Sequence, residues 1–282
     1  MKTWIIFVAL WGIFKGIREP IKKKALEKTS VLSVLFMYTF IGFLMAVPFA
    51  RDVFSLSATA YFFIFLKSAV LFVAWILGLS SLKRLPVSLY GVIDVTRVIF
   101  STLMGIIFLG ERLNLTGVIS LILVATGVGL ASSKKAVKQE NCRYTDIGLV
   151  IISCLLNSVS GTIDKHIMTT QNVDSSQLLF WYMLFLSAMY LSYILITKTK
   201  LDIKGSIKNP YIYIMSFLLV FGDKLVFIAN QDPESRVTVM TLIKQCSVLV
   251  TIFLGMVLYK EKNIIRKIIC SGIIILGIML SV

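Results

Sequence analysis

Residues 108–130 read FLGERLNLTGVISLILVATGVGL, and residues 258–280 read LYKEKNIIRKIICSGIIILGIML. Each stretch has a glutamate (Glu111 or Glu261) before an apolar run and a glycine (Gly127 or Gly277) sixteen positions later. The two copies are 150 positions apart, since 261 − 111 and 277 − 127 both give 150. Any two apolar helices can be aligned somewhere by chance, but an acid and a glycine that recur together favour a true repeat. The sequence therefore predicts two related halves.

The composition is typical of a membrane protein. Of 282 residues, 57% are hydrophobic and 15% are charged, and the mean hydropathy is +0.89. The apolar residues form long runs that do not alternate with polar ones, which predicts helices and excludes barrel strands. A bilayer core needs roughly 20 apolar residues per helix. We expect ten spans, at about 3–22, 31–50, 59–82, 87–109, 115–132, 146–168, 177–196, 210–230, 237–259 and 264–281.

A second recurrence lies near the start of each half. Gly16 and Glu19 correspond to Gly161 and Asp164, each 145 positions later (161 − 16 and 164 − 19). Five spans per half is an odd number, so the second half must insert upside-down relative to the first, and such halves usually enclose a site near the bilayer midplane. We predict an all-α polytopic membrane protein with inverted five-helix repeats at 1–132 and 146–282, joined by a linker at 133–145.

These stretches resemble the EamA-type ten-helix transporters of the drug/metabolite transporter superfamily. The likeness includes LPVSLYGVIDVTRVIFSTLMGII at 85–107 and the weaker copy VTVMTLIKQCSVLVTIFLGMVLYKEK at 237–262, and it covers nearly the whole chain. The second copy departs from the first, because Tyr259-Lys260-Glu261-Lys262 stands where the first has Leu109-Gly110-Glu111-Arg112. The resemblance implies a transporter, but its members carry amino acids, sugar derivatives, cations and lipid-linked groups, so it names no solute.

Charged residues inside the spans are the candidates for the transport site. A charge at mid-bilayer costs about 2.5–3.5 kcal/mol on insertion scales, so it normally faces a cavity or a partner. Asp94 and Arg97 are three apart and share a helical face with Tyr90. Lys244 follows Asp94 by 150 positions, so we expect the two on opposite walls of a central cavity, with Arg97 nearby. The alternative is that Asp94 and Arg97 only neutralise each other.

Two further spans carry charges. Lys67 is far from either end of the third span, so we expect it to face a cavity. Asp223 and Lys224 are adjacent in the eighth span and point about 100° apart, so one is expected to bind substrate and the other a neighbouring helix. The predicted substrate-binding residues are Asp94, Arg97, Lys244, Lys224, Lys67, Tyr90 and Asp223.

Glu19 and Asp164 are the candidates for proton coupling, because a partly desolvated carboxylate takes up a proton more readily. The alternative is that both lie at helix ends near the lipid head groups. Lys15 and Glu19 are four apart and are expected to pair with each other.

Other classes of function are disfavoured. We find no G-x-S-x-G, no H-E-x-x-H and no Gly-rich phosphate loop, so no enzyme is expected. A single histidine and four cysteines without a C-x-x-C pair predict no metal site and no cofactor. The formal charge of +15 comes from residues between apolar runs rather than from a basic stripe, so no nucleic-acid partner is expected.

Positive charges outnumber negative ones inside the spans, which favours an anionic or zwitterionic solute. We therefore predict a secondary active transporter that moves a small polar metabolite across the cell membrane by alternating access, as a monomer or homodimer in the lipid bilayer. The alternative is a flippase or exporter of a lipid-linked or lipophilic compound.

The sequence leaves the orientation of the chain in the membrane open. The distribution of basic residues between the loops would put both termini outside, whereas the resemblance implies cytoplasmic termini. A reporter fused after Val282 distinguishes the two.

Overall fold

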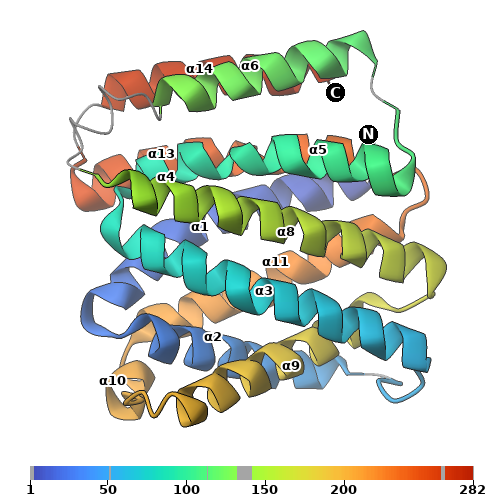
Figure 1. Cartoon of the computed structure of the whole chain (residues 1–282), viewed down its shortest axis with the longest axis vertical. Helices are drawn as coiled ribbons and strands as arrows, with labels where there is room; N and C mark the ends of the chain where they lie inside the picture. The colour runs from blue at the N-terminus through green and yellow to red at the C-terminus, as the bar shows by residue number, and fades with distance from the viewer. Residues whose placement is uncertain (1–2, 51, 113, 132–141, 262–263, 282) are drawn as a thin grey trace.

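The chain folds into helices that run in roughly the same direction, parallel or antiparallel, and are stacked in layers (Figure 1). The computed structural model describes residues 3–50, 52–112, 114–131, 142–261 and 264–281. The first half comprises α1 (Thr3–Lys28), α2 (Val31–Ala46), η1 (Val47–Phe49), α3 (Ala58–Arg84), α4 (Val87–Asp94), α5 (Thr96–Leu109) and α6 (Leu115–Ala131). The second half comprises α8 (Tyr144–Thr170), α9 (Ser175–Ile196), α10 (Ile203–Ile207), α11 (Pro210–Gln231), α12 (Val237–Lys244), α13 (Cys246–Tyr259) and α14 (Ile264–Ser281).

The expected spans coincide with these helices. Seven spans of the described chain are long and apolar enough to cross a membrane, with α4–α5 and α12–α13 each forming one of them. The predicted linker at 133–145 lies mostly outside the described residues, and α8 begins at Tyr144.

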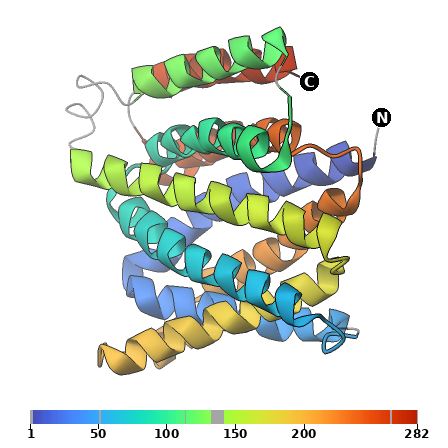
Figure 2. The same cartoon turned by 45° about the vertical axis from the view of Figure 1, so that its right-hand side comes forward.

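The two halves pack in a reciprocal pattern. Helix α1 packs on α11 of the other half, and its counterpart α8 packs on α3. The pairs α2–α9 and α6–α14 each join equivalent helices, and both views show α6 beside α14 at one end of the molecule (Figures 1 and 2). The protein is thus an all-α membrane protein of about ten spans in two inverted repeats.

Helix α1 continues through Pro20 and beyond residue 22, where the sequence predicted the end of the first span. Proline has no N–H, so the carbonyl of Gly16 loses its usual partner within the helix. The Thr251 hydroxyl of α13 lies 3.3 Å from that carbonyl and 2.8 Å from the Ser247 carbonyl of its own helix, so the two carbonyls share one donor. Neighbouring helices with such hydroxyl groups are one way in which transmembrane helices tolerate proline. The extension to Lys28 places Glu19 well inside α1.

Two spans are interrupted at equivalent points. Val95 separates α4 from α5, and Gln245, 150 positions later, separates α12 from α13. The sequence predicted each span as one continuous helix. Each interruption directly follows a charged residue that the sequence analysis had singled out, Asp94 or Lys244.

The repeated glutamates cap these broken spans across the two halves. The N–H groups of Val237 and Thr238, which begin α12, donate to the Glu111 carboxylate at 2.7 and 3.0 Å. In the same way Glu261 accepts from the first N–H of α4 at 2.6 Å. A carboxylate at a helix N-terminus satisfies unpaired N–H groups and complements the helix dipole. Each glutamate therefore fastens the start of a helix in the other half.

The residue before each glutamate has a left-handed backbone, at Gly110 (φ +65°) and Lys260 (φ +48°). Glycine adopts this conformation freely, whereas in other residues the Cβ atom comes too close to a backbone carbonyl oxygen.

We expect Lys260→Gly to raise the unfolding free energy by roughly 0.5–1 kcal/mol. Thermal unfolding in detergent measures the change. Lys204→Gly, within right-handed α10, is the control and should lower stability; a lower midpoint for Lys260→Gly would contradict the argument.

Candidate functional site

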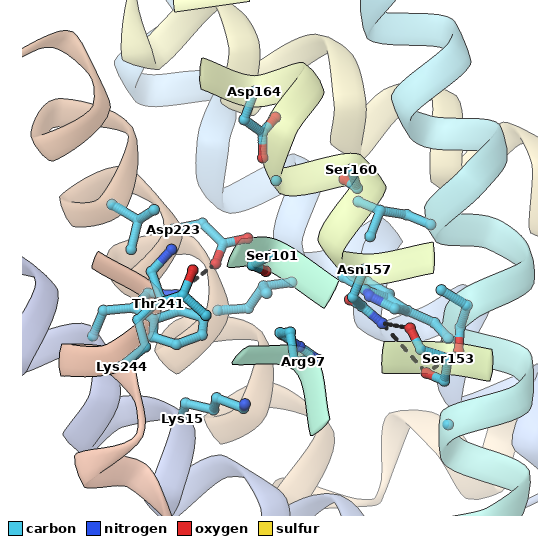
Figure 3. Close-up of a pocket in the computed structure, with 18 of the residues that line it drawn as sticks. Lys15, Arg97, Ser101, Ser153, Asn157, Ser160, Asp164, Asp223, Thr241 and Lys244 are labelled. Atoms are coloured by element: carbon cyan, nitrogen blue, oxygen red, sulfur yellow. Dashed lines mark hydrogen bonds between the residues drawn. The ribbon is translucent and has the colours of Figure 1, made fainter. Parts of the chain in front are cut away.

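A cavity of about 130 Å³ lies between the two halves, with room for several water molecules (Figure 3). Its wall draws on α1, α3, α4 and α5 from the first half and on α8, α11 and α12 from the second. The charged and polar residues of this wall are Lys15, Arg18, Glu19, Lys22, Lys67, Tyr90, Arg97, Ser101, Ser153, Asn157, Ser160, Asp164, Asp223, Asn230, Thr241 and Lys244. Such a chamber at the junction of inverted repeats is where transporters bind their solutes.

Asp94 lies behind the cavity wall rather than on it. It is 4% exposed, and its carboxylate pairs with Lys15 and, at 3.0 Å, with Arg97. The expectation that Asp94 and Lys244 form opposite walls therefore fails for Asp94, because two cations cover its carboxylate. The prediction that Lys15 pairs with Glu19 is also wrong. The ion-pair partner of Glu19 is Lys22, whose amine lies 2.9 Å from the Glu19 carboxylate.

Lys67 and Asp164 form an ion pair that joins α3 to α8 at the cavity. Lys67 is 1% exposed, and its amine also lies 4.2 Å and 4.4 Å from the ring centroids of Tyr182 and Phe227. The rings and the carboxylate together replace the water that an ammonium loses on burial. Like Glu19, Asp164 is interior to its helix rather than at a helix end.

Asp223 lines the cavity, whereas Lys224 points away from it. The Asp223 carboxylate accepts hydrogen bonds from the Trp11 indole at 3.0 Å and from the Tyr182 hydroxyl. Within the described part of the chain no cation lies within 4.0 Å of it. The Lys224 amine instead lies 4.0 Å from the Phe49 ring centroid. Of the two adjacent charges, the acid lies at the cavity and the base lies against η1. Lys224, which the sequence also placed among the substrate-binding residues, is therefore not part of the cavity wall.

Two cations of the wall, Lys244 and Arg18, have no carboxylate within 4.0 Å among the residues that the structure describes. Lys244 lies with its amine 5.1 Å from the Trp11 ring centroid, and Lys15 approaches the same ring at 5.5 Å. Arg18 is 6% exposed, and its Nε has no hydrogen-bond partner. The site therefore holds cationic groups that are available to a solute.

The charge of the wall is positive, with six basic side chains against the acids Glu19, Asp164 and Asp223. Low-dielectric walls strengthen the field of such an excess inside a cleft. The described residues include no group of three or more histidine, cysteine, aspartate or glutamate side chains placed to hold a metal ion.

The sequence analysis missed Trp11 and the polar stripe of α8. Ser153, Asn157, Ser160 and Asp164 recur every three to four residues and reach the cavity together (Figure 3). This spacing puts residues on one helical face, so a polar stripe within an apolar helix was the available signal. Trp11 gave no such signal, because it takes part in the site by donating a hydrogen bond to Asp223, which is 212 positions away in the sequence.

Two inverted halves around a charged chamber define a multi-pass membrane transporter. A family model described as the EamA-like transporter family matches residues 2–133 and 145–282, so the chain belongs to this family of transporters. A solved structure titled "Crystal structure of protein" is similar, with a TM-score of 0.75 and 12% sequence identity over 100% of this chain and 98% of that one. This likeness concerns the fold alone. The search of curated proteins finds no match.

Proposed function

We propose that this transporter carries a small anionic or zwitterionic metabolite across the cell membrane by alternating access through the central cavity. The observation that carries the proposal is that Lys244 and Arg18 line the cavity and that no carboxylate of the described residues lies within 4.0 Å of either. A desolvated cation is costly, and a solute anion would supply the missing partner. Tyr90 and Arg97 line the same chamber and add a hydroxyl and a further guanidinium.

Asp223 extends the proposal to zwitterions. It receives hydrogen bonds from neutral donors, Trp11 and Tyr182, and no cation of the described residues lies within 4.0 Å of its carboxylate. A solute with a positive group would complement Asp223 while its anionic group meets Lys244. A lipophilic cation would meet the basic excess of the wall and be repelled.

Glu19 and Asp164 are the groups that we propose for proton coupling. Both carboxylates line the cavity and are paired with lysines, Lys22 and Lys67. Protonation of either acid would leave its lysine without a partner, so proton uptake and rearrangement of the cavity wall would be linked. A solute anion would then compete for the released lysine.

Lys244→Met tests the site. A metabolite library is screened first against the purified protein by thermal stabilisation, since a bound ligand stabilises by mass action. We expect the hits to be anions or zwitterions, and Lys244→Met to weaken their binding by about 10- to 100-fold, the range for a charged hydrogen bond. Uptake into proteoliposomes should fall in parallel.

Lys224→Met is the matched control, because it removes the same charge from a side chain that does not line the cavity. It should keep the wild-type response to each hit. Hits that are mainly lipophilic cations, or a Lys244→Met protein that binds and transports like wild type, would refute the proposal.

A further inference from the structure

In Figure 1, α5 ends and α6 begins on the side of the molecule where α1 begins and α14 ends. A second, smaller cavity of about 40 Å³ is lined by residues of α5, α6 and α12 near this side. It sits between the connection from α5 to α6 and the start of α12, so both halves contribute to it. Helix ends are at the level of the lipid head groups in a bilayer. This cavity is separate from the central chamber, with which it shares no lining residue.

Two arginines, one from each half, line this cavity. Arg112 follows the capping residue Glu111, and Arg236 directly precedes α12. Both are exposed, and no described carboxylate lies within 4.0 Å of either guanidinium. The planar guanidinium matches the geometry of phosphate and binds it in bidentate fashion. The N–H groups of α12 do not contribute, because Glu111 already accepts from them.

The surroundings of the arginines fit a phospholipid. Thr238 and Asn114 also line the cavity, and Leu121 gives it an apolar side. The neighbouring surface of α6 is apolar and open, with Leu115 75% and Ile122 60% exposed. A phosphate between the arginines would therefore have its acyl chains beside an apolar helix face.

The arginine pair breaks the symmetry of the two halves. The position equivalent to Arg236 in the first half is Pro86, and the one equivalent to Arg112 in the second half is Lys262. The opposite face of the molecule therefore does not repeat this pair. A feature that the repeat does not require is better explained by a ligand on one side of the membrane than by the fold.

We propose that Arg112 and Arg236 bind the phosphate of an anionic phospholipid head group. The lipid would bridge the α5–α6 connection of the first half and the start of α12 in the second, next to the joint that Glu111 caps. Basic residues at the membrane surface attract anionic lipids, and two arginines on one phosphate add directed hydrogen bonds to that attraction.

The test measures the melting temperature of the full-length protein in neutral detergent with added phosphatidylglycerol, phosphatidylcholine or inorganic phosphate. We expect phosphatidylglycerol at about 100 times its Kd to raise the midpoint by roughly 5 °C. Native mass spectrometry should show a retained phosphatidylglycerol. Arg112→Gln with Arg236→Gln should lose both effects.

Lys200→Gln with Lys204→Gln is the control, because it removes equal charge from exposed residues outside this cavity. It should respond to phosphatidylglycerol like wild type. An equal response of the double arginine variant to phosphatidylglycerol would overturn the site. An equal effect of inorganic phosphate alone would overturn the assignment to a lipid and leave a site for free phosphate.

Discussion

Asp94→Asn is expected to lower the stability of the fold by about 3–5 kcal/mol, the usual cost of breaking a buried ion pair. Asp94 is the carboxylate that both Lys15 and Arg97 contact, and Lys15 is only 5% exposed. An amide of the same shape keeps the packing but leaves two cations without their counter-charge. Thermal unfolding of the purified protein in detergent measures the loss, which corresponds to a fall of roughly 6–20 °C in the midpoint.

A second substitution separates charge from packing. Adding Lys15→Met to Asp94→Asn removes one of the stranded cations and should recover a clear part of the lost stability. Double-mutant cycles measure such coupling directly. Exchanging charges through Asp94→Lys and Lys244→Asp should fail to restore the fold, because Lys15 and Arg97 would then face a third cation. A midpoint within 1 °C of wild type for Asp94→Asn would refute this account.

The positions of the spans followed from the sequence, whereas the ion-pair partners did not. Apolar runs of membrane length fix where helices lie, because lipid tolerates few charges, and the helix ends agree within a few residues for most spans. Pairing from sequence extends only to neighbours on one helix, such as Arg97 with Asp94. Lys15 reaches Asp94 across 79 positions, which only the packing of α1 on the other helices decides.

The sequence repeat predicted the equivalent glutamates correctly but not the surroundings of the equivalent charges Asp94 and Lys244. It predicted equivalent positions for Glu111 and Glu261, and both act as caps on the other half. It also placed Asp94 and Lys244 at equivalent positions, yet one lies behind the wall and the other on it. The reason is local: Asp94 has Lys15 and Arg97 within reach, while the Lys244 amine approaches the face of Trp11 and has no carboxylate within 4.0 Å in the described part of the chain. Equivalent backbone positions therefore need not give equivalent side-chain environments.

Lys67→Met is expected to lower both the stability of the fold and the rate of transport. It leaves the Asp164 carboxylate without its lysine partner at the cavity wall, so we expect a loss of about 3–5 kcal/mol. The double variant Lys67→Met with Asp164→Leu removes both charges, and well-packed apolar replacements of buried pairs are often neutral or stabilising. Its melting temperature should therefore return close to that of wild type.

The same double variant tests the proposed proton coupling. If Asp164 takes up the proton that drives transport, the variant with Lys67→Met and Asp164→Leu should be stable. Its solute uptake in proteoliposomes should no longer respond to an imposed pH gradient. Lys224→Met, which leaves this ion pair intact, should keep the wild-type response. Recovery of gradient-driven uptake together with stability would show that Lys67 and Asp164 serve only to hold α3 against α8, and would leave Glu19 as the remaining candidate.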